Sequence, residues 1–132
     1  MTDTTTPDLT TPEGTQALID VYLEMWRATD PDVRTAKVEA AFTPEGRHVD
    51  QHADATGHAA LTEMAAGVHT GFPGFRMTQT SGIDRFGDHL RFAWALDAAD
   101  GTPIVAGLDV AEVAPDGRLQ QVTGFWGDLP AA

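Results

Sequence analysis

The sequence predicts an α+β fold in which helices pack on one face of an antiparallel sheet. Three observations lead to this expectation. The first half of the chain holds two helix-capping residues that are each followed by proline, and a third stretch with helical spacing of apolar residues. The second half holds four strand-like apolar stretches separated by turn signals. Helices followed by a run of strands are typical of an α+β domain rather than of an alternating α/β domain.

The length of 132 residues suits one domain. The opening stretch MTDTTTPDLTT is rich in threonine and has no apolar period, which predicts a disordered tail over residues 1–11. A single domain is then expected over residues 12–132. The sequence contains no repeat and no sign of a second domain.

Three helices are predicted before the strands begin. Thr11 is a suitable N-cap for Pro12, and the apolar stripe that follows is Leu18, Ile19, Val21, Tyr22, Met25 and Trp26. A second cap and proline, Asp30 and Pro31, open a helix that TPEG at 43–46 is expected to end. The third helix is predicted over GHAALTEMAAGVHTG, residues 57–71, with Leu61, Met64 and Val68 as its apolar stripe.

Strands account for most of the remaining chain. A short strand, RHVDQ at 47–51, is expected between the second and third helices. The four longer strands are predicted over Phe75–Arg85, Leu90–Asp97, Pro103–Ala114 and Leu119–Trp126. The turn signals FGDH, AADG and PDG between them indicate an antiparallel meander.

The strand that contains IVAGLDVAEV, residues 104–113, carries one carboxylate among apolar neighbours. One face of this strand carries Val105, Gly107, Asp109, Ala111 and Val113. Burial of an unpaired charge costs several kcal/mol, and a raised pKa is the usual escape. Asp109 is therefore expected either to face water or to line a pocket as a neutral carboxylic acid.

The opposite face of the same strand is also largely apolar, with Ile104, Leu108 and Val110. One face is expected to pack on the helices, and too few elements remain to cover the other. The sequence therefore predicts a homodimer through the outer face of the sheet, with a two-sided strand buried within one chain as the alternative.

Composition excludes several classes of function. A net charge of −12 makes nucleic acid and an anionic membrane surface unfavourable partners. The absence of cysteine excludes disulfides, zinc–thiolate sites and a thiol nucleophile. No apolar run is long enough for a membrane span or a signal peptide, so a cytoplasmic location is expected. Arginine outnumbers lysine and asparagine is absent, which is typical of GC-rich bacterial genomes.

The order and spacing of these elements resemble the nuclear transport factor 2-like superfamily, which includes ketosteroid isomerases and SnoaL-like polyketide cyclases. The matching stretches are VYLEMW, FTPEGRHVDQHADATGHAAL, RFAWAL and GLDVAEVAPDGRLQQVTGFWGDLP. The resemblance implies a cone-shaped fold, with a strongly curved antiparallel sheet and three N-terminal helices on its concave face around a pocket. It also implies chemistry without a cofactor.

The resemblance further assigns catalytic positions. In ketosteroid isomerase-like members a carboxylate at the end of the first strand is the base, and Asp50 in HVDQ resembles it, followed here by Gln51 instead of the frequent proline. A helix-one tyrosine and a protonated strand aspartate form the oxyanion hole, and Tyr22 and Asp109 resemble them. The epoxide-hydrolase branch is disfavoured, because Gly107 stands where that branch has arginine.

The residues themselves are consistent with these assignments. Asp109 has the more apolar surroundings and suits a neutral donor, whereas Asp50 lies between His48 and His52 and suits an ionised base. A turn residue at Asp50 and a core tyrosine at Tyr22 are the structural alternatives. If the strand stays extended, His48, Asp50 and His52 share a face, which permits a His–Asp hydrogen bond or a two-ligand metal contact. Three ligands on a straight strand cannot converge, so no metal site is predicted.

Aromatic residues are the candidate lining of the pocket. Substrate binding is predicted for Trp26, His52, Trp94, Phe125 and Trp126, with core packing as the alternative for the aromatic rings. The leading functional hypothesis is a cofactor-independent enzyme, an isomerase or lyase, that moves a proton next to a carbonyl group of an apolar, steroid- or polyketide-like ligand. The alternative is a non-catalytic ligand-binding or dimerisation module of the same fold.

Overall fold

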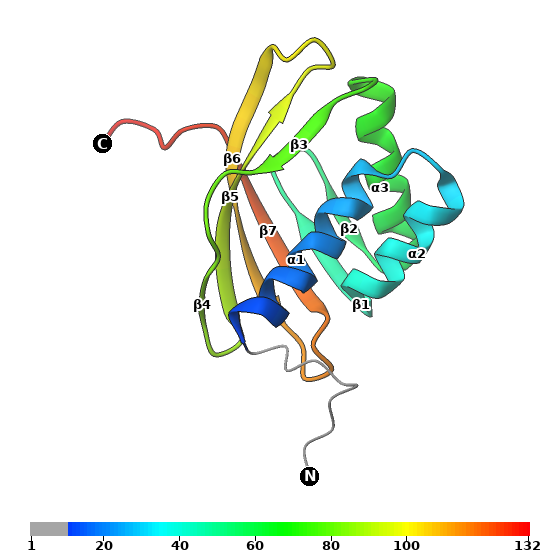
Figure 1. The fold of residues 1–132 in the computed structure, drawn as a ribbon, viewed down its shortest axis with the longest axis vertical. Helices are drawn as coiled ribbons and strands as arrows, with labels where there is room; N and C mark the ends of the chain where they lie inside the picture. Colours follow the sequence, from blue (N-terminus) through cyan, green and yellow to red (C-terminus); the bar gives the residue numbers. More distant parts are fainter. Residues whose placement is uncertain (1–10) are drawn as a thin grey trace.

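The computed structural model describes residues 11–132, so residues 1–10 of the predicted tail lie outside the described residues. Three helices and seven strands make up the described part of the chain (Figure 1). The helices are α1 (Pro12–Arg27), α2 (Pro31–Ala41) and α3 (His58–Gly71). The strands are β1 (Phe42–Val49), β2 (Asp54–Thr56), β3 (Arg76–Gln79), β4 (Asp84–Phe86), β5 (His89–Asp97), β6 (Pro103–Val113) and β7 (Leu119–Trp126).

The helices begin where the sequence predicts. The Thr11 hydroxyl accepts a hydrogen bond from the backbone N–H of Gly14 at 3.1 Å, which caps α1. A carboxylate oxygen of Asp30 accepts from the N–H of Asp32 at 2.8 Å and caps α2. Helix α3 begins at His58, one residue after the start of its predicted range.

All seven strands form one strongly curved sheet in the order β2-β1-β7-β6-β5-β3, with β4 also paired to β5. Strand β1 is parallel to β7, while the other pairs are antiparallel. The prediction of a wholly antiparallel sheet is therefore wrong at this pair. After β1 the chain forms β2, α3 and strands β3 to β6. The last strand, β7, then lies beside β1 and runs in the same direction. Side-chain alternation is the same in either orientation, so the sequence pattern carried no sign of this pairing.

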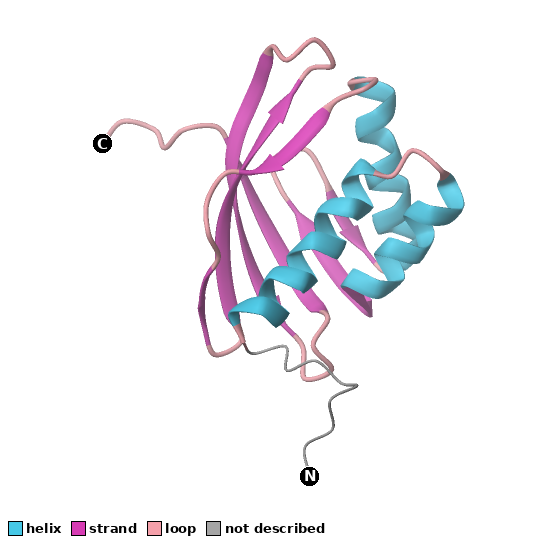
Figure 2. Cartoon of the chain, in the orientation of Figure 1, coloured by secondary structure: helices cyan, strands magenta, loops and turns pink. Residues whose placement is uncertain are grey.

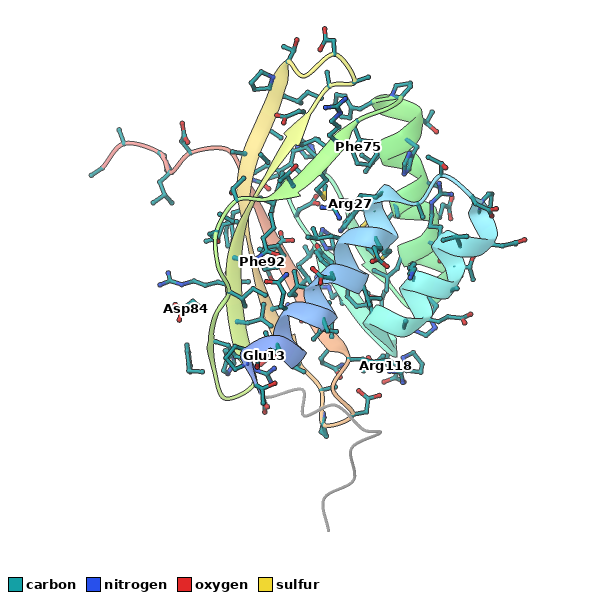
Figure 3. All side chains as sticks on the ribbon, in the orientation of Figure 1. Glu13, Arg27, Phe75, Asp84, Phe92 and Arg118 are labelled. Carbon is teal, nitrogen blue, oxygen red and sulfur yellow. The ribbon has the colours of Figure 1, made fainter. Side chains whose placement is uncertain are left out.

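The three helices lie on the concave side of the sheet (Figure 2). Helix α1 buries the predicted stripe, including Ile19, Tyr22 and Met25, against the sheet. Arg27, labelled in Figure 3, lies at the C-terminal end of α1. Its Nε donates to the backbone carbonyl of Met77 in β3 at 2.9 Å. The predicted fold class is confirmed apart from the mixed pairing of its sheet.

Strand β1 differs from its prediction at both ends. It begins at Phe42, directly after α2, so the TPEG stretch lies inside the strand instead of forming a separate turn. The pairing of β1 with β7 shifts register between Phe42 and Arg47. Pro44, which has no N–H to donate to a neighbouring strand, lies within this irregular stretch. The strand ends at Val49, so the expectation that residues 47–51 stay extended is wrong.

Two short strands also escaped prediction. The stretch predicted as one strand over Phe75–Arg85 is divided into β3 and β4 around Ser81 and Gly82. Strand β2 has only three residues, too few for alternation to be recognised. The three remaining long strands match their predicted ranges to within one residue at each end.

The two faces of β6 separate as predicted. Asp109, Ala111 and Val113 are buried under the helices, while Ile104 and Val110 are 36% and 38% exposed. We call the second surface the outer face; it also carries Phe125 of β7, which is 51% exposed and paired with Leu108. No helix of residues 11–132 covers the outer face (Figure 2). Nor is any helix in this range long and apolar enough to span a membrane.

Candidate active site

Asp109 is a buried carboxyl group with two hydrogen-bond donors. It lies in the middle of β6, opposite Phe92 of β5 and Gly124 of β7, and is 4% exposed. The hydroxyl of Tyr22 donates to Oδ2 at 2.7 Å, and the indole Nε1–H of Trp94 donates to Oδ1 at 3.0 Å. Three elements, α1, β5 and β6, therefore converge on one carboxyl group.

Gly107 makes room for the indole donor. It lies opposite Trp94 in the β5–β6 register, and a Cβ at this position would lie 2.4 Å from Trp94 Cζ2 and 2.5 Å from the carbonyl oxygen of Phe125. A larger residue would thus displace either the indole or the neighbouring strand. The glycine places the Trp94 ring against the sheet with its N–H directed at Asp109.

Burial raises the pKa of Asp109 above the ordinary value for aspartate. Hydrogen bonds from Tyr22 and Trp94 and the charge of His48 oppose the rise, and the charge of Asp50 adds to it. Burial also raises the pKa of Tyr22 well above its ordinary value, reinforced by the neighbouring Asp109. The pair is therefore biased towards its neutral, fully protonated form.

Asp50 has the opposite environment. It follows the last residue of β1, where the chain turns, and Oδ1 accepts from the backbone N–H groups of His52 at 2.7 Å and Ala53 at 2.9 Å. Oδ2 lies 3.0 Å from Nε2 of His48. Burial alone would raise the pKa of Asp50, but these three hydrogen bonds outweigh burial and lower it. Asp50 is therefore held as a carboxylate.

The side chains of Asp109 and Asp50 both lie beside Gly124 of β7. A Cβ on this glycine would lie 3.1 Å from Asp109 Oδ1, 3.3 Å from Asp50 Cβ and 3.7 Å from His48 Cε1. Asp109, Asp50 and His48 thus surround one point on the concave face of the sheet. Any side chain at position 124 would fill the space between the three groups.

His48 is the neighbour of Asp50 for which the sequence permitted either a hydrogen bond to Asp50 or a metal contact. It is 3% exposed, and its ring lies edge-on to that of Trp26 with centroids 5.2 Å apart. Because Asp50 is ionised and can only accept, Nε2 of His48 carries the proton of their hydrogen bond. The other ring nitrogen, Nδ1, is buried and makes no hydrogen bond within residues 11–132.

Two connected hollows adjoin these groups. The inner cavity, of about 20 Å³, has Tyr22, His48, Asp50, Trp94 and Asp109 in its wall. The main pocket, of about 670 Å³, lies between α3 and the β1–β2 segment, and its wall includes Trp26, Asp50, His52, Met64, Val68 and Trp126. Trp26, Asp50, Val68 and Trp126 line both hollows. Asp50 is therefore at the boundary between the water-sized inner cavity and the ligand-sized main pocket.

The structure brings most of the predicted site residues together. Trp26, His52 and Trp126 line the main pocket, and the His52 ring lies edge-on to that of Trp126 with centroids 4.8 Å apart. Trp94 lines only the inner cavity, where it serves Asp109. Phe125 is not part of the site, because neighbouring strand residues point to opposite faces and Trp126 takes the inner one.

The contribution of α3 to the pocket was not predicted. Ala60, Met64, Gly67 and Val68 recur at helical spacing and line the main pocket, with Phe72 just beyond the helix. The spacing of Leu61, Met64 and Val68 indicated a buried stripe, but only Leu61 is fully buried. Helical periodicity cannot distinguish a side chain that packs in the core from one that lines a pocket.

Metal binding has no support in the side-chain arrangement. Among residues 11–132, no group of three or more His, Asp and Glu side chains could hold a metal ion. His48 contacts Asp50 directly, while His52 lies beyond the turn against Trp126. The turn after Val49 separates the ligands that an extended HVDQH strand would have aligned.

Gly67 provides a way to close the main pocket. A Cβ at Gly67 would meet no atom within 4 Å, and this helical glycine lines the pocket. Gly67→Ala is expected to raise the free energy of unfolding by about 0.5–1 kcal/mol, measured by urea denaturation, because alanine favours helix.

Gly67→Leu is expected to fill the pocket and weaken binding of the neutral dye Nile red. Gly71→Leu, also in open space but outside the lining, is the matched control; equal dye binding by both leucine variants would contradict this prediction.

Comparisons with known proteins agree with this architecture. No protein-family model and no curated protein matches the sequence. A proposed isomerase of the SnoaL-like family from Agrobacterium tumefaciens superposes with a TM-score of 0.81 at 28% identity, over 86% of this chain and 97% of that one. A protein of ketosteroid isomerase-like fold from Catenulispora acidiphila, solved in complex with trimethylamine, has a TM-score of 0.68 at 17% identity over 83% and 85% of the two chains.

A proposed polyketide cyclase from Sinorhizobium meliloti is similar to the same extent. Its TM-score is 0.67 at 14% identity, over 86% of this chain and 98% of that one. Each of these proteins has the curved sheet and helix arrangement described above, across nearly its whole length. The chain therefore has the α+β fold of the nuclear transport factor 2-like proteins.

Proposed function

We propose that this protein is a cofactor-independent enzyme that moves a proton next to a carbonyl group, as an isomerase or a cyclase does. The observation that carries the proposal is the pair of unequal carboxyl groups beside Gly124. Three N–H donors hold Asp50 ionised, whereas burial favours neutral Asp109. An ionised base beside a neutral hydrogen-bond donor is what enolisation requires.

In the proposed reaction Asp50 takes the proton from the carbon next to the carbonyl group. The electrons of the broken C–H bond form a carbon–carbon double bond, and the carbonyl π electrons move to oxygen. Tyr22 donates a hydrogen bond to the resulting oxyanion, and neutral Asp109 in turn donates to Tyr22. In a β,γ-unsaturated substrate, protonated Asp50 then returns its proton to the γ-carbon, and the double bond moves into conjugation with the carbonyl group. Alternatively, the enolate carbon attacks a second carbonyl group and closes a ring, and the new alkoxide takes the proton from Asp50.

The Tyr22–Asp109 contact suits this role. When Asp109 is neutral, its own proton can occupy the 2.7 Å contact, which leaves the Tyr22 O–H free to donate to the substrate oxygen. The inner cavity of about 20 Å³ has room for one oxygen atom beside this pair. The main pocket would hold the rest of an apolar, steroid- or polyketide-like molecule. The names of the Agrobacterium and Sinorhizobium relatives, a proposed isomerase and a proposed polyketide cyclase, support this reaction class.

Hydrogen–deuterium exchange tests the proposal before the physiological substrate is known. The protein is incubated in D₂O with a panel of apolar cyclic ketones and 1,3-diketones, and deuterium uptake next to the carbonyl is followed by mass spectrometry. Wild-type protein is expected to accelerate uptake for at least one compound. A panel in which no compound exchanges faster than in buffer argues against the proposed reaction.

A second candidate, a non-catalytic ligand-binding module, is favoured by a different observation. Both oxygens of Asp109 already have internal donors, and Tyr22 is only 1% exposed. The same residues could therefore simply complete a polar core beneath a binding pocket. This candidate predicts saturable binding of an apolar ligand with no exchange in D₂O.

We further propose that two copies of the chain pair through the outer face. Apolar residues remain exposed there on adjacent strands, among them Ile104, Val110 and Phe125. Such a surface on one copy is complementary to the same surface on another copy related by a two-fold axis. The proposed dimer leaves the helix side, and with it the pocket, accessible.

Phe125→Arg is expected to convert the dimer to a monomer. The substitution places a charge among the apolar side chains of the outer face, next to Leu108 in the paired strand. Sedimentation velocity should give a mass near 14.1 kDa for the variant and twice that for the wild type. Leu129→Arg, at a 93% exposed position near the C-terminus, is the control and should remain dimeric. Monomeric wild-type protein would refute the proposed pairing.

A further inference from the structure

The wall of the main pocket combines aromatic rings and carboxylates. The aromatic side chains are Trp26, Phe72 and Trp126, and the acidic ones are Asp50, Asp54 and Glu63. No lysine or arginine among the described residues lines this pocket. A phosphate or carboxylate group on a ligand would therefore meet no ammonium or guanidinium group in this wall, and its one imidazole, His52, lies against Trp126.

The three carboxylates differ in how far they are neutralised. Asp54 receives two hydrogen bonds from the guanidinium of Arg47, both at 2.8 Å. Asp50 is hydrogen-bonded to His48 and to backbone N–H groups. Glu63, on the pocket side of α3, is exposed and forms no ion pair within residues 11–132. Glu63 is therefore the carboxylate of this wall that is available to pair with a ligand.

A cation satisfies this wall better than a neutral or negative group. The faces of tryptophan and phenylalanine rings attract ammonium groups, most strongly where water is partly excluded. The carboxylate of Glu63 adds a direct Coulomb attraction, and the net charge of −12 concentrates cations around the molecule as a whole. An anionic ligand is repelled by the ring faces, by the carboxylate of Glu63 and by the net negative charge.

We propose that the main pocket takes an apolar molecule that carries a protonated amine, held between the aromatic rings and Glu63. Glu63 lines the main pocket but not the inner cavity, whereas Asp50 lines both. One ligand can therefore place its ammonium group at α3 and its carbonyl group at Asp50. The carbonyl end of this assignment rests on the proposed function; the amine end does not.

Three compounds with the same phenylalkyl body separate the effect of charge from that of apolar contact. They are 4-phenylbutylamine, 4-phenylbutan-1-ol and 5-phenylpentanoate, and their binding to full-length protein is measured at pH 7 by calorimetry and tryptophan fluorescence. The amine is expected to bind roughly tenfold more tightly than the alcohol. The carboxylate is expected to bind more weakly than either. The preference for the amine should decrease as salt is added.

Two matched variants locate the effect at the pocket. Glu63→Gln is expected to lower the preference for the amine over the alcohol roughly threefold to fivefold, with little change in binding of the alcohol. Glu39→Gln removes the same charge from an exposed position on α2 outside the pocket wall, and should leave the preference unchanged. Equal loss in both variants would mean that only the overall charge matters, and would overturn the assignment to Glu63.

Equal binding of the amine and the alcohol, tighter binding of the carboxylate, or no binding of the amine would each overturn the inference. The assay involves no turnover, so its failure leaves the proton-transfer proposal intact. Conversely, failure of deuterium exchange with a confirmed amine preference would leave a cation-selective binding pocket without the proposed chemistry.

Discussion

Asp50→Asn is expected to lower kcat/KM for proton abstraction about 10²- to 10⁴-fold, the usual contribution of a positioned general base. The amide has almost the same shape as the carboxylate and keeps an oxygen for the N–H groups of His52 and Ala53. It cannot take a proton from carbon. The rate of deuterium uptake next to the carbonyl of the best ketone in the panel measures the effect.

Stability should change less than activity in this variant. Only the contact with His48 is lost, and a hydrogen bond to a charged group contributes about 1.5–3 kcal/mol. Asp116→Asn, the same substitution in an exposed turn beside Arg118, is the control and should keep full activity. If Asp50→Asn exchanges as fast as the wild type, Asp50 is not the base.

Asp109→Leu is expected to cost both activity and stability. It removes the acid that directs the Tyr22 O–H at the oxyanion, and loss of that oxyanion hydrogen bond is worth about 10²- to 10³-fold in kcat. It also leaves the Tyr22 hydroxyl and the Trp94 N–H buried without an acceptor, at about 1–3 kcal/mol each. Urea denaturation and the exchange assay measure the two losses. A leucine variant as stable as the wild type would show that these contacts are not formed in solution.

Asp109→Asn keeps the shape of the side chain but removes its titratable proton. Comparison of the variant with the wild type therefore shows how the titration of Asp109 affects stability. A raised pKa in the folded protein means that the neutral acid adds stability below the unfolded value of about 3.9, and that this stability is lost as pH rises through the folded value. The stability of the wild type relative to Asp109→Asn should therefore fall as the pH rises above about 4. Carboxylates that do not interact with Asp109 titrate equally in both proteins and cancel. A difference that grows with pH would mean that Asp109 is ionised in the fold.

Local sequence was sufficient for the helices, the long strands and the two faces of β6. Caps such as Thr11 and Asp30 satisfy N–H groups within three residues, so their effect is visible in a short window of sequence. Alternation along β6 likewise placed Asp109 on the buried face before its partners were known. The assignment of Asp50, Tyr22 and Asp109 to one site came from the resemblance and from their unequal surroundings.

Only the tertiary structure decided which distant groups meet. The parallel pairing of β1 with β7 brings Asp50 to Gly124 and so next to Asp109, and no pattern within either strand indicates the direction of a neighbour. The same holds for Trp94, whose N–H reaches Asp109 because Gly107 in the adjacent strand leaves space for the ring. Phe125 and Trp126 fall on opposite faces because β7 stays extended through both. Periodicity reports which side of an element is buried, whereas packing between elements determines whether that side meets a core, a pocket or a second carboxyl group.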